Sequence, residues 1–142
     1  MNNNVNNVNN VNNIEYNYKK SRYLSLQMLA TIGFIIALLI SYLLTYDKKC
    51  SLENKKGLFT EKEAQNLALF QTILVFFIAL TFLYVNYKQY DLSKRSNDGD
   101  QQDLFLQIET SIFAIISAVI GLYIIFKNYR KTTLQISETE LF

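Results

Sequence analysis

The sequence predicts an all-α membrane protein with three transmembrane helices and an Asn-rich extended N-terminal arm. Two observations support this prediction. Half of the 142 residues are hydrophobic while only 18% are charged, and the apolar residues are concentrated in three blocks separated by charged loops. Each block is just over 20 residues long, and a helix needs about 20 apolar residues to cross the hydrocarbon.

The blocks run from Leu24 to Tyr46, from Asn66 to Tyr87 and from Leu104 to Phe126. A backbone in lipid must satisfy its own hydrogen bonds, so each block is expected to be helical. The first block is too long for a signal peptide and is expected to remain as a span. The predicted organisation is therefore an arm at residues 1–20, a three-helix unit at 21–130 and a polar tail at 131–142.

The ends of the spans carry interfacial and capping signals. Thr60 and Glu63 form a capping box, which predicts that the second helix starts in water before the bilayer. The segment Asn97–Asp103, "NDGDQQD", is typical of a turn followed by an acidic helix start. Tyrosines, which prefer the membrane interface, lie near the span ends at Tyr16, Tyr18, Tyr23, Tyr42, Tyr46, Tyr84, Tyr87, Tyr90, Tyr123 and Tyr129.

Three spans place the arm and the Asp91–Asp103 loop on one side of the membrane, and the Asp47–Lys62 loop and the tail on the other. The first side carries six Lys or Arg residues and the second carries eight. This difference is too small for the positive-inside rule to set the orientation, which stays open with the second side slightly favoured as cytoplasmic.

Glu109 is the ionisable residue that lies deepest in the spans. One interpretation is a functional carboxylate paired with Arg22 or Lys88, which the topology places at the same membrane face, in an intramembrane polar cluster. The other is a boundary residue at the edge of a slightly short span, because Gln107 and Thr110 beside it are also polar.

Small residues form one stripe on the first span and another on the third. Such stripes let helix backbones approach closely in lipid, which predicts that the first helix packs against the third while the second covers them. The alternative is that small residues are simply common in membrane spans. The predicted helix-packing residues are Ala30, Gly33, Ala37 and Ser41 in the first span and Ala114, Ser117, Ala118 and Gly121 in the third, where Thr110 extends the stripe.

The composition argues against catalysis and nucleic-acid binding. There is no His, and the lone Cys50 cannot form an internal disulfide or build a metal site. No nucleophile–base pair or paired carboxylates can be recognised, so no enzyme, cofactor or metal is expected. The net charge of +2 is too weak to indicate a nucleic-acid partner. The expected partners are the lipid bilayer and other proteins of one assembly.

The segment Leu83–Asp100, "LYVNYKQYDLSKRSNDGD", followed by the span Ser111–Arg130, resembles small multi-span membrane proteins of large nucleocytoplasmic DNA viruses. The Asn-rich start also fits an AT-rich genome. The resemblance implies a virion membrane protein or a minor capsid protein that ties the shell to the membrane beneath it, and it brings no catalytic residues. An accessory membrane subunit of a protist organelle complex would look similar.

The arm has apolar residues at every third position, namely Val5, Val8, Val11 and Ile14. This period matches neither a helix nor a strand. Two readings remain: low-complexity filler, or an extended arm whose amides bond to a neighbouring protein.

Taken together, these features lead us to expect a structural membrane protein that anchors or bridges a larger assembly. The alternatives are a small oligomeric channel or transporter subunit and an accessory subunit of an organelle complex.

Overall fold

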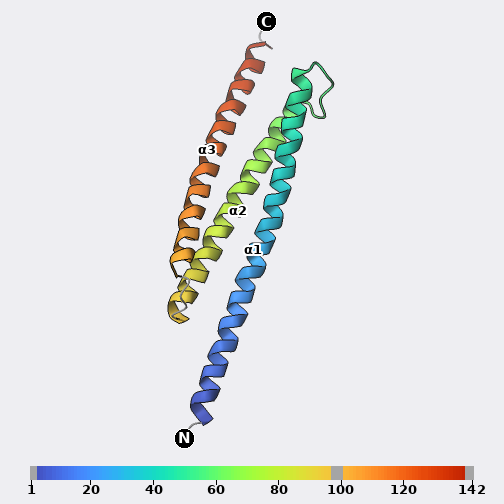
Figure 1. The fold of residues 1–142 in the computed structure, drawn as a ribbon. Coiled ribbons are helices and arrows are strands. Elements are labelled where there is room, and N and C mark those ends of the chain that lie inside the picture. Colours follow the sequence, from blue (N-terminus) through green and yellow to red (C-terminus); the bar gives the residue numbers. More distant parts are fainter. Residues whose placement is uncertain (1–2, 97–100, 140–142) are drawn as a thin grey trace.

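The structure is a computed structural model that describes residues 3–96 and 101–139, with side chains for 14–95 and 101–128. It contains three helices: α1 (Asn3–Leu52), α2 (Glu61–Ser96) and α3 (Gln101–Thr139). All three are long and apolar enough to cross a membrane, and the described residues include no strand. The predicted all-α fold with three transmembrane helices is confirmed, and its long antiparallel helices are seen in Figure 1.

The helices bury little of their apolar surface against one another. Only 11 to 17% of the residues in their most apolar windows are buried. Large side chains such as Met28, Phe77 and Phe113 are between 61 and 71% exposed. In water this surface would be strongly unfavourable, but in a bilayer it faces acyl chains. The exposed apolar surface therefore fits an integral membrane protein.

Helix α2 is the central helix of the bundle. It packs against both α1 and α3, whereas α1 and α3 have no Cα atoms within 8 Å of each other among the described residues. The predicted packing of the first helix against the third is therefore wrong. Both small-residue stripes contact α2 instead: a Cβ atom at Gly33 would lie 3.2 Å from Ile78 Cδ1, and one at Gly121 would lie 3.4 Å from Thr72 Cγ2.

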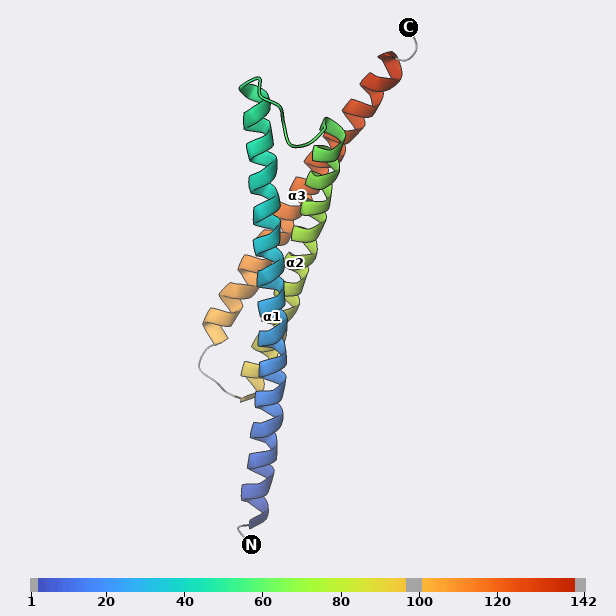
Figure 2. The same ribbon diagram turned by 90° about the vertical axis from the view of Figure 1, so that its right-hand side faces the viewer.

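The N-terminal arm also departs from its prediction, because residues 3–20 are helical and belong to α1. Residues 1–2 lie outside the described part of the chain. No Pro or Gly occurs before Gly33, and adding residues to an existing helix is much easier than nucleating one. The helix of the first span therefore continues into the arm, which projects beyond the ends of α2 and α3 (Figures 1 and 2).

Each helix is longer than the hydrocarbon is thick. At 1.5 Å per residue, α1, α2 and α3 are about 75, 54 and 58 Å long, against roughly 30 Å of hydrocarbon. The helix α3 crosses the other two at an angle, which Figure 2 shows most clearly. It continues through most of the predicted polar tail, up to Thr139.

Backbone hydrogen bonds cap the C-terminal end of α1, where the connection to α2 begins. Asn54 has a φ of 54°, and the amides of Asn54 and Lys55 donate to the carbonyls of Ser51 and Cys50 at 3.2 and 2.9 Å. This is a Schellman motif with Asn in the left-handed position. It ends α1 at Leu52.

The start of α2 confirms the predicted capping box. The amide of Thr60 donates to Glu63 Oε2 at 2.8 Å, and the amide of Glu63 donates to Thr60 Oγ1 at 3.3 Å. These two bonds satisfy donors that a helix start otherwise leaves free. The predicted turn before α3 falls partly on residues 97–100, outside the described residues. The helix itself starts at Gln101 with Asp103 in its first turn.

Candidate functional site

Polar side chains gather at the end of the bundle from which the N-terminal part of α1 projects. We call this region the polar end. On α2 it begins with Asn86, Gln89 and Ser93, whose spacings of three and four residues place them on one face of the helix. Asn86 is 6% exposed and Ser93 is 4% exposed. Because buried polar groups require partners, this face indicates interactions with the neighbouring helices.

Asn86 joins α2 to α3. Its Nδ2 donates to Ser111 Oγ at 2.9 Å and to the carbonyl oxygen of Gln107 at 3.2 Å. The Ser111 hydroxyl in turn donates to the same Gln107 carbonyl at 2.9 Å. The Oδ1 atom of Asn86 is buried without a protein partner, which carries a desolvation cost. The side-chain amide of Asn86 therefore connects α2 specifically to α3, and its Oδ1 acceptor has no protein partner.

A second set of contacts joins α1 to α2. Gln89 Nε2 donates to Gln27 Oε1 at 3.3 Å. The rings of Tyr23 and Tyr84 meet edge-to-face with their centroids 6.5 Å apart, a favourable geometry for aromatic pairs. The start of the first span and the end of the second therefore lie at the same membrane surface.

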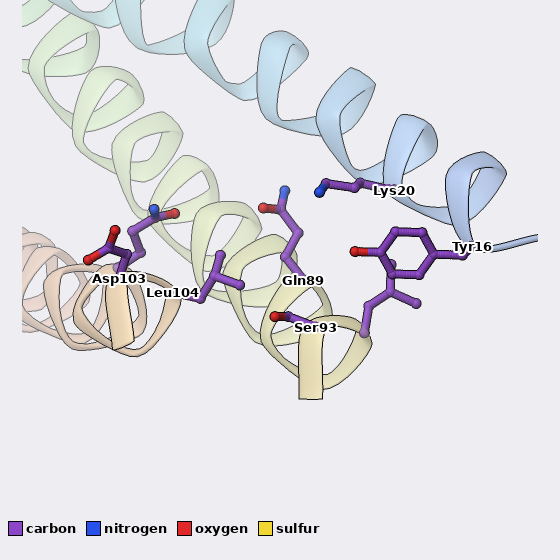
Figure 3. Close-up of a pocket in the computed structure, with 8 residues that line it drawn as sticks. Tyr16, Lys20, Gln89, Ser93, Asp103 and Leu104 are labelled. Carbon is purple, nitrogen blue, oxygen red and sulfur yellow. The ribbon is translucent and has the colours of Figure 1, made fainter. Parts of the chain in front are cut away.

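A pocket of about 240 Å³ lies at this end and is lined by all three helices (Figure 3). We call it the three-helix pocket. Figure 3 shows Tyr16 and Lys20 of α1 facing Gln89 and Ser93 of α2, with Asp103 at the α3 side. The Lys20 ammonium also lies 5.6 Å from the centroid of the Tyr16 ring, within cation–π range. The full lining is Tyr16, Lys20, Gln89, Leu92, Ser93, Asp103, Leu104 and Gln107.

The three-helix pocket is lined by polar groups of several kinds. It holds one cation, one carboxylate and several hydroxyl and amide groups. These groups can donate and accept hydrogen bonds. Among the described residues, no group of three or more His, Cys, Asp or Glu side chains could hold a metal ion. Cys50 lies at the other end of α1 as a buried free thiol.

The predicted intramembrane cluster of Arg22, Lys88 and Glu109 is not brought together. Glu109 and Arg22 are exposed, and they lie on α3 and α1, which have no Cα atoms within 8 Å of each other in the described part of the chain. The ion pairs formed by residues 14–95 and 101–128 do not join Glu109 to either cation. Lys88 instead lies 5.9 Å from the centroid of the Tyr84 ring.

The predicted helix-packing residues divide into two groups. Ala30, Ala37 and Ala118 are buried at 6, 1 and 5% exposure, and the two glycines face α2. Ser41 is half-buried, while Ala114 and Ser117 are exposed. The energetic role of these residues in holding the helices together stays a prediction.

Sequence reasoning missed the polar face of α2. Asn86 and Gln89 occur in the stretch "NYKQY", which reads as an ordinary span end followed by a charged loop. The available signal was their spacing with Ser93, which continues the buried face of α2 beyond the apolar block. No protein-family model, curated protein or solved structure matches the chain.

Proposed function

We propose that the chain is a structural membrane subunit that anchors or bridges a larger assembly through the projecting N-terminal part of α1. The observation that carries this proposal is the length of α1. The part of α1 before Leu24 is about 30 Å long at 1.5 Å per residue. Its later residues lie beside α2, and its beginning continues past the ends of α2 and α3 (Figures 1 and 2). A helix that leaves the membrane in this way is suited to reach a protein above the lipid surface.

The bundle itself supports an anchoring role better than a channel role. A pore needs a continuous hydrated lining. The residues buried along the middle of the bundle are instead apolar, among them Ala37, Ile78, Ala79 and Ala118. The three-helix pocket lies at one end. A single chain therefore offers a packed apolar centre with a polar region at one surface.

The finer form of the proposal is attachment of a membrane to a capsid in a large DNA virus. It rests on the resemblance of Leu83–Asp100 and Ser111–Arg130 to small virion membrane proteins, together with the projecting helix. In this setting the chain would lie in the inner membrane of the virion, and in host membranes during assembly. Residues 1–20 would contact other membrane or capsid proteins, with no nucleic acid involved.

Crosslinking mass spectrometry on the native source tests the anchoring role. A lysine-reactive reagent reports on Lys19 and Lys20 at the base of the projecting helix, and Lys55 and Lys56 at the opposite end of the bundle provide the internal control. We expect crosslinks from Lys19 and Lys20 to one defined protein partner, with few or none from the control pair. Crosslinks from the two pairs to the same scattered set of proteins would contradict the proposal.

Hydrogen exchange provides a second, independent test. The backbone amides of residues 3–14 are expected to exchange quickly in detergent-purified protein, because a single exposed helix opens easily. In the intact assembly they are expected to be protected by a partner. Equally fast exchange in both samples would show that the projecting helix is not held by a neighbouring protein.

A further inference from the structure

A second pocket lies between α1 and α2 and differs in charge from the three-helix pocket. We call it the basic pocket. Its volume is about 190 Å³, and its lining is Lys19, Tyr23, Lys88, Asp91, Leu92 and Arg95. Three cationic side chains and one carboxylate leave it with a net charge of +2 at neutral pH. The three-helix pocket, in contrast, is lined by one Lys and one Asp and therefore carries no net charge.

The cations of the basic pocket are only weakly engaged. Lys19 pairs with Glu15 at 2.6 Å, and Arg95 pairs with Asp91 at 3.0 Å. The hydrogen bond and charge of Lys19 lower the pKa of the Glu15 carboxyl. Both pairs are exposed and four residues apart on one helix, an arrangement that contributes little to stability and exchanges easily for another anion.

Lys88 carries a positive charge with no carboxylate partner in the described part of the chain. It directly follows Tyr87, the last residue of the second apolar block. It lies over the face of the Tyr84 ring, an interaction that leaves its N–H donors free for an anion. Lys88 is therefore the cation best placed to receive a new anionic partner.

The depth of the basic pocket in the membrane indicates which class of anion it meets. Tyr23 directly precedes the first apolar block, and its contact with Tyr84 places the ends of the first two spans at one surface. Lipid headgroups occupy this level, and basic pockets between transmembrane helices are known to bind anionic headgroups. An Arg guanidinium is also suited to bidentate contact with phosphate oxygens.

We propose that the basic pocket binds a phosphate group, and that in the membrane this phosphate belongs to the headgroup of an anionic phospholipid. Lys88 and Arg95 of α2 contact the phosphate oxygens, and Lys19 of α1 approaches from the other side of the pocket. Asp91 disfavours a more highly charged anion and sets a limit on the charge accepted. This lipid site is independent of the proposed anchoring role, because it requires only the membrane and not a protein partner.

The test uses the full chain in lipid nanodiscs and native mass spectrometry to count bound lipids. Nanodiscs of phosphatidylcholine are compared with nanodiscs that also contain phosphatidic acid, and soluble glycerol 3-phosphate is the probe for free phosphate. The variant Lys88→Gln/Arg95→Gln removes two cations from the basic pocket. Its matched control, Lys48→Gln/Lys56→Gln, removes two exposed cations near the opposite end of the bundle. The variant Lys88→Arg keeps the positive charge.

We expect saturable binding of one phosphatidic acid by the native chain and by Lys88→Arg. Removing two cations is expected to weaken binding by about 30-fold, with a change below about twofold in the control. Equal losses in the pocket variant and the control would overturn the site, because they would show a non-specific attraction to total charge. Undiminished binding in Lys88→Gln/Arg95→Gln would overturn it as well. Glycerol 3-phosphate binding as tightly as phosphatidic acid would overturn the lipid assignment. Unchanged helicity by circular dichroism controls for folding.

Discussion

The two ends of the bundle are held together by different kinds of interaction. At the loop end, residues 53–60 connect α1 to α2, and the polar groups bond to backbone nearby in the chain. Asp47 accepts hydrogen bonds from the amides of Leu58 and Phe59, and the capping box completes the start of α2. At the polar end, side chains from all three helices meet, with Asn86 bonding across to Ser111 and two pockets between the helices.

This difference separates polar groups that bond to nearby backbone from polar groups that join two helices. The loop end satisfies its backbone locally, and so it can form as soon as α1 and α2 exist. The polar end depends on side-chain hydrogen bonds between residues 25 and 62 positions apart in the chain, and it retains a buried unpaired acceptor at Asn86 Oδ1. Such unpaired groups and open pockets are where a membrane protein has capacity left for ligands or partners.

The largest expected effect is at Asn86. Substituting Asn86→Asp places a charge at a buried position and replaces the amide donor that bonds to Ser111 and Gln107. Burying a charge in a membrane-spanning helix is costly, so the free energy of unfolding should fall by about 3 kcal/mol. Unfolding of the full chain in mixed micelles, followed by circular dichroism, measures this change.

Asn66→Asp is the matched control, because Asn66 is on the same helix but exposed near the loop end. The same change of amide to carboxylate there should alter the free energy of unfolding by less than about 0.5 kcal/mol. Similar losses at both positions would show that the two ends of α2 are equally sensitive to charge.

A smaller effect is expected where α3 meets α2. Ala118 is 5% exposed, whereas Ala114, one turn away on α3, is exposed. Ala118→Leu overpacks the contact and should lower the free energy of unfolding by about 2 kcal/mol. Ala114→Leu adds the same atoms to a lipid-facing position and should have little effect. Equal effects of the two substitutions would show that the small residues do not define the packing face.

Features governed by local sequence were predictable, and features governed by helix pairing were not. The spans follow from the length of the apolar blocks, and the capping box follows from Thr60 and Glu63 alone. A stripe of small residues indicates that a helix is approached closely, but it does not identify the approaching helix. The stripes of α1 and α3 predict a contact between these two helices, yet Ile78 of α2 packs against Gly33.

The polar end and the arm were missed for related reasons. Asn86 ends an apolar block, so it reads as a boundary residue until Ser111 of α3 is seen beside it. The arm has no helical periodicity, but helix extension needs none when a long span already provides the nucleus. In both cases the structure depends on an adjacent helical segment: α3 beside Asn86, and the first span next to the arm. Local composition does not reveal this dependence.

At the loop end, the carboxylate of Asp47 provides the next test. Asp47→Ala removes the acceptor for the amides of Leu58 and Phe59. Each lost hydrogen bond should cost about 1 kcal/mol of local stability. Amide exchange of residues 57–60 should accelerate while exchange near Asn86 stays unchanged. Acceleration at both ends would show that the loop and the polar end open together as one cooperative unit.

The smallest effect concerns the pH dependence of the capping box. Hydrogen bonds from the Thr60 amide and hydroxyl lower the pKa of the Glu63 carboxyl below its ordinary value of 4.5. The ionised carboxylate therefore stabilises the first turn of α2 at neutral pH, and this contribution is lost as the pH falls below 4.5 and through the lowered pKa. A carboxyl-carbon NMR titration in micelles measures the pKa of Glu63. In Thr60→Val the hydroxyl donor is removed while the amide remains, so the pKa of Glu63 should move part of the way back toward 4.5. A native Glu63 that titrates at 4.5 or above, or an unchanged titration in Thr60→Val, would show that the capping box does not hold in solution. In that case the loop end would lose one of the local bonds that distinguish it from the polar end.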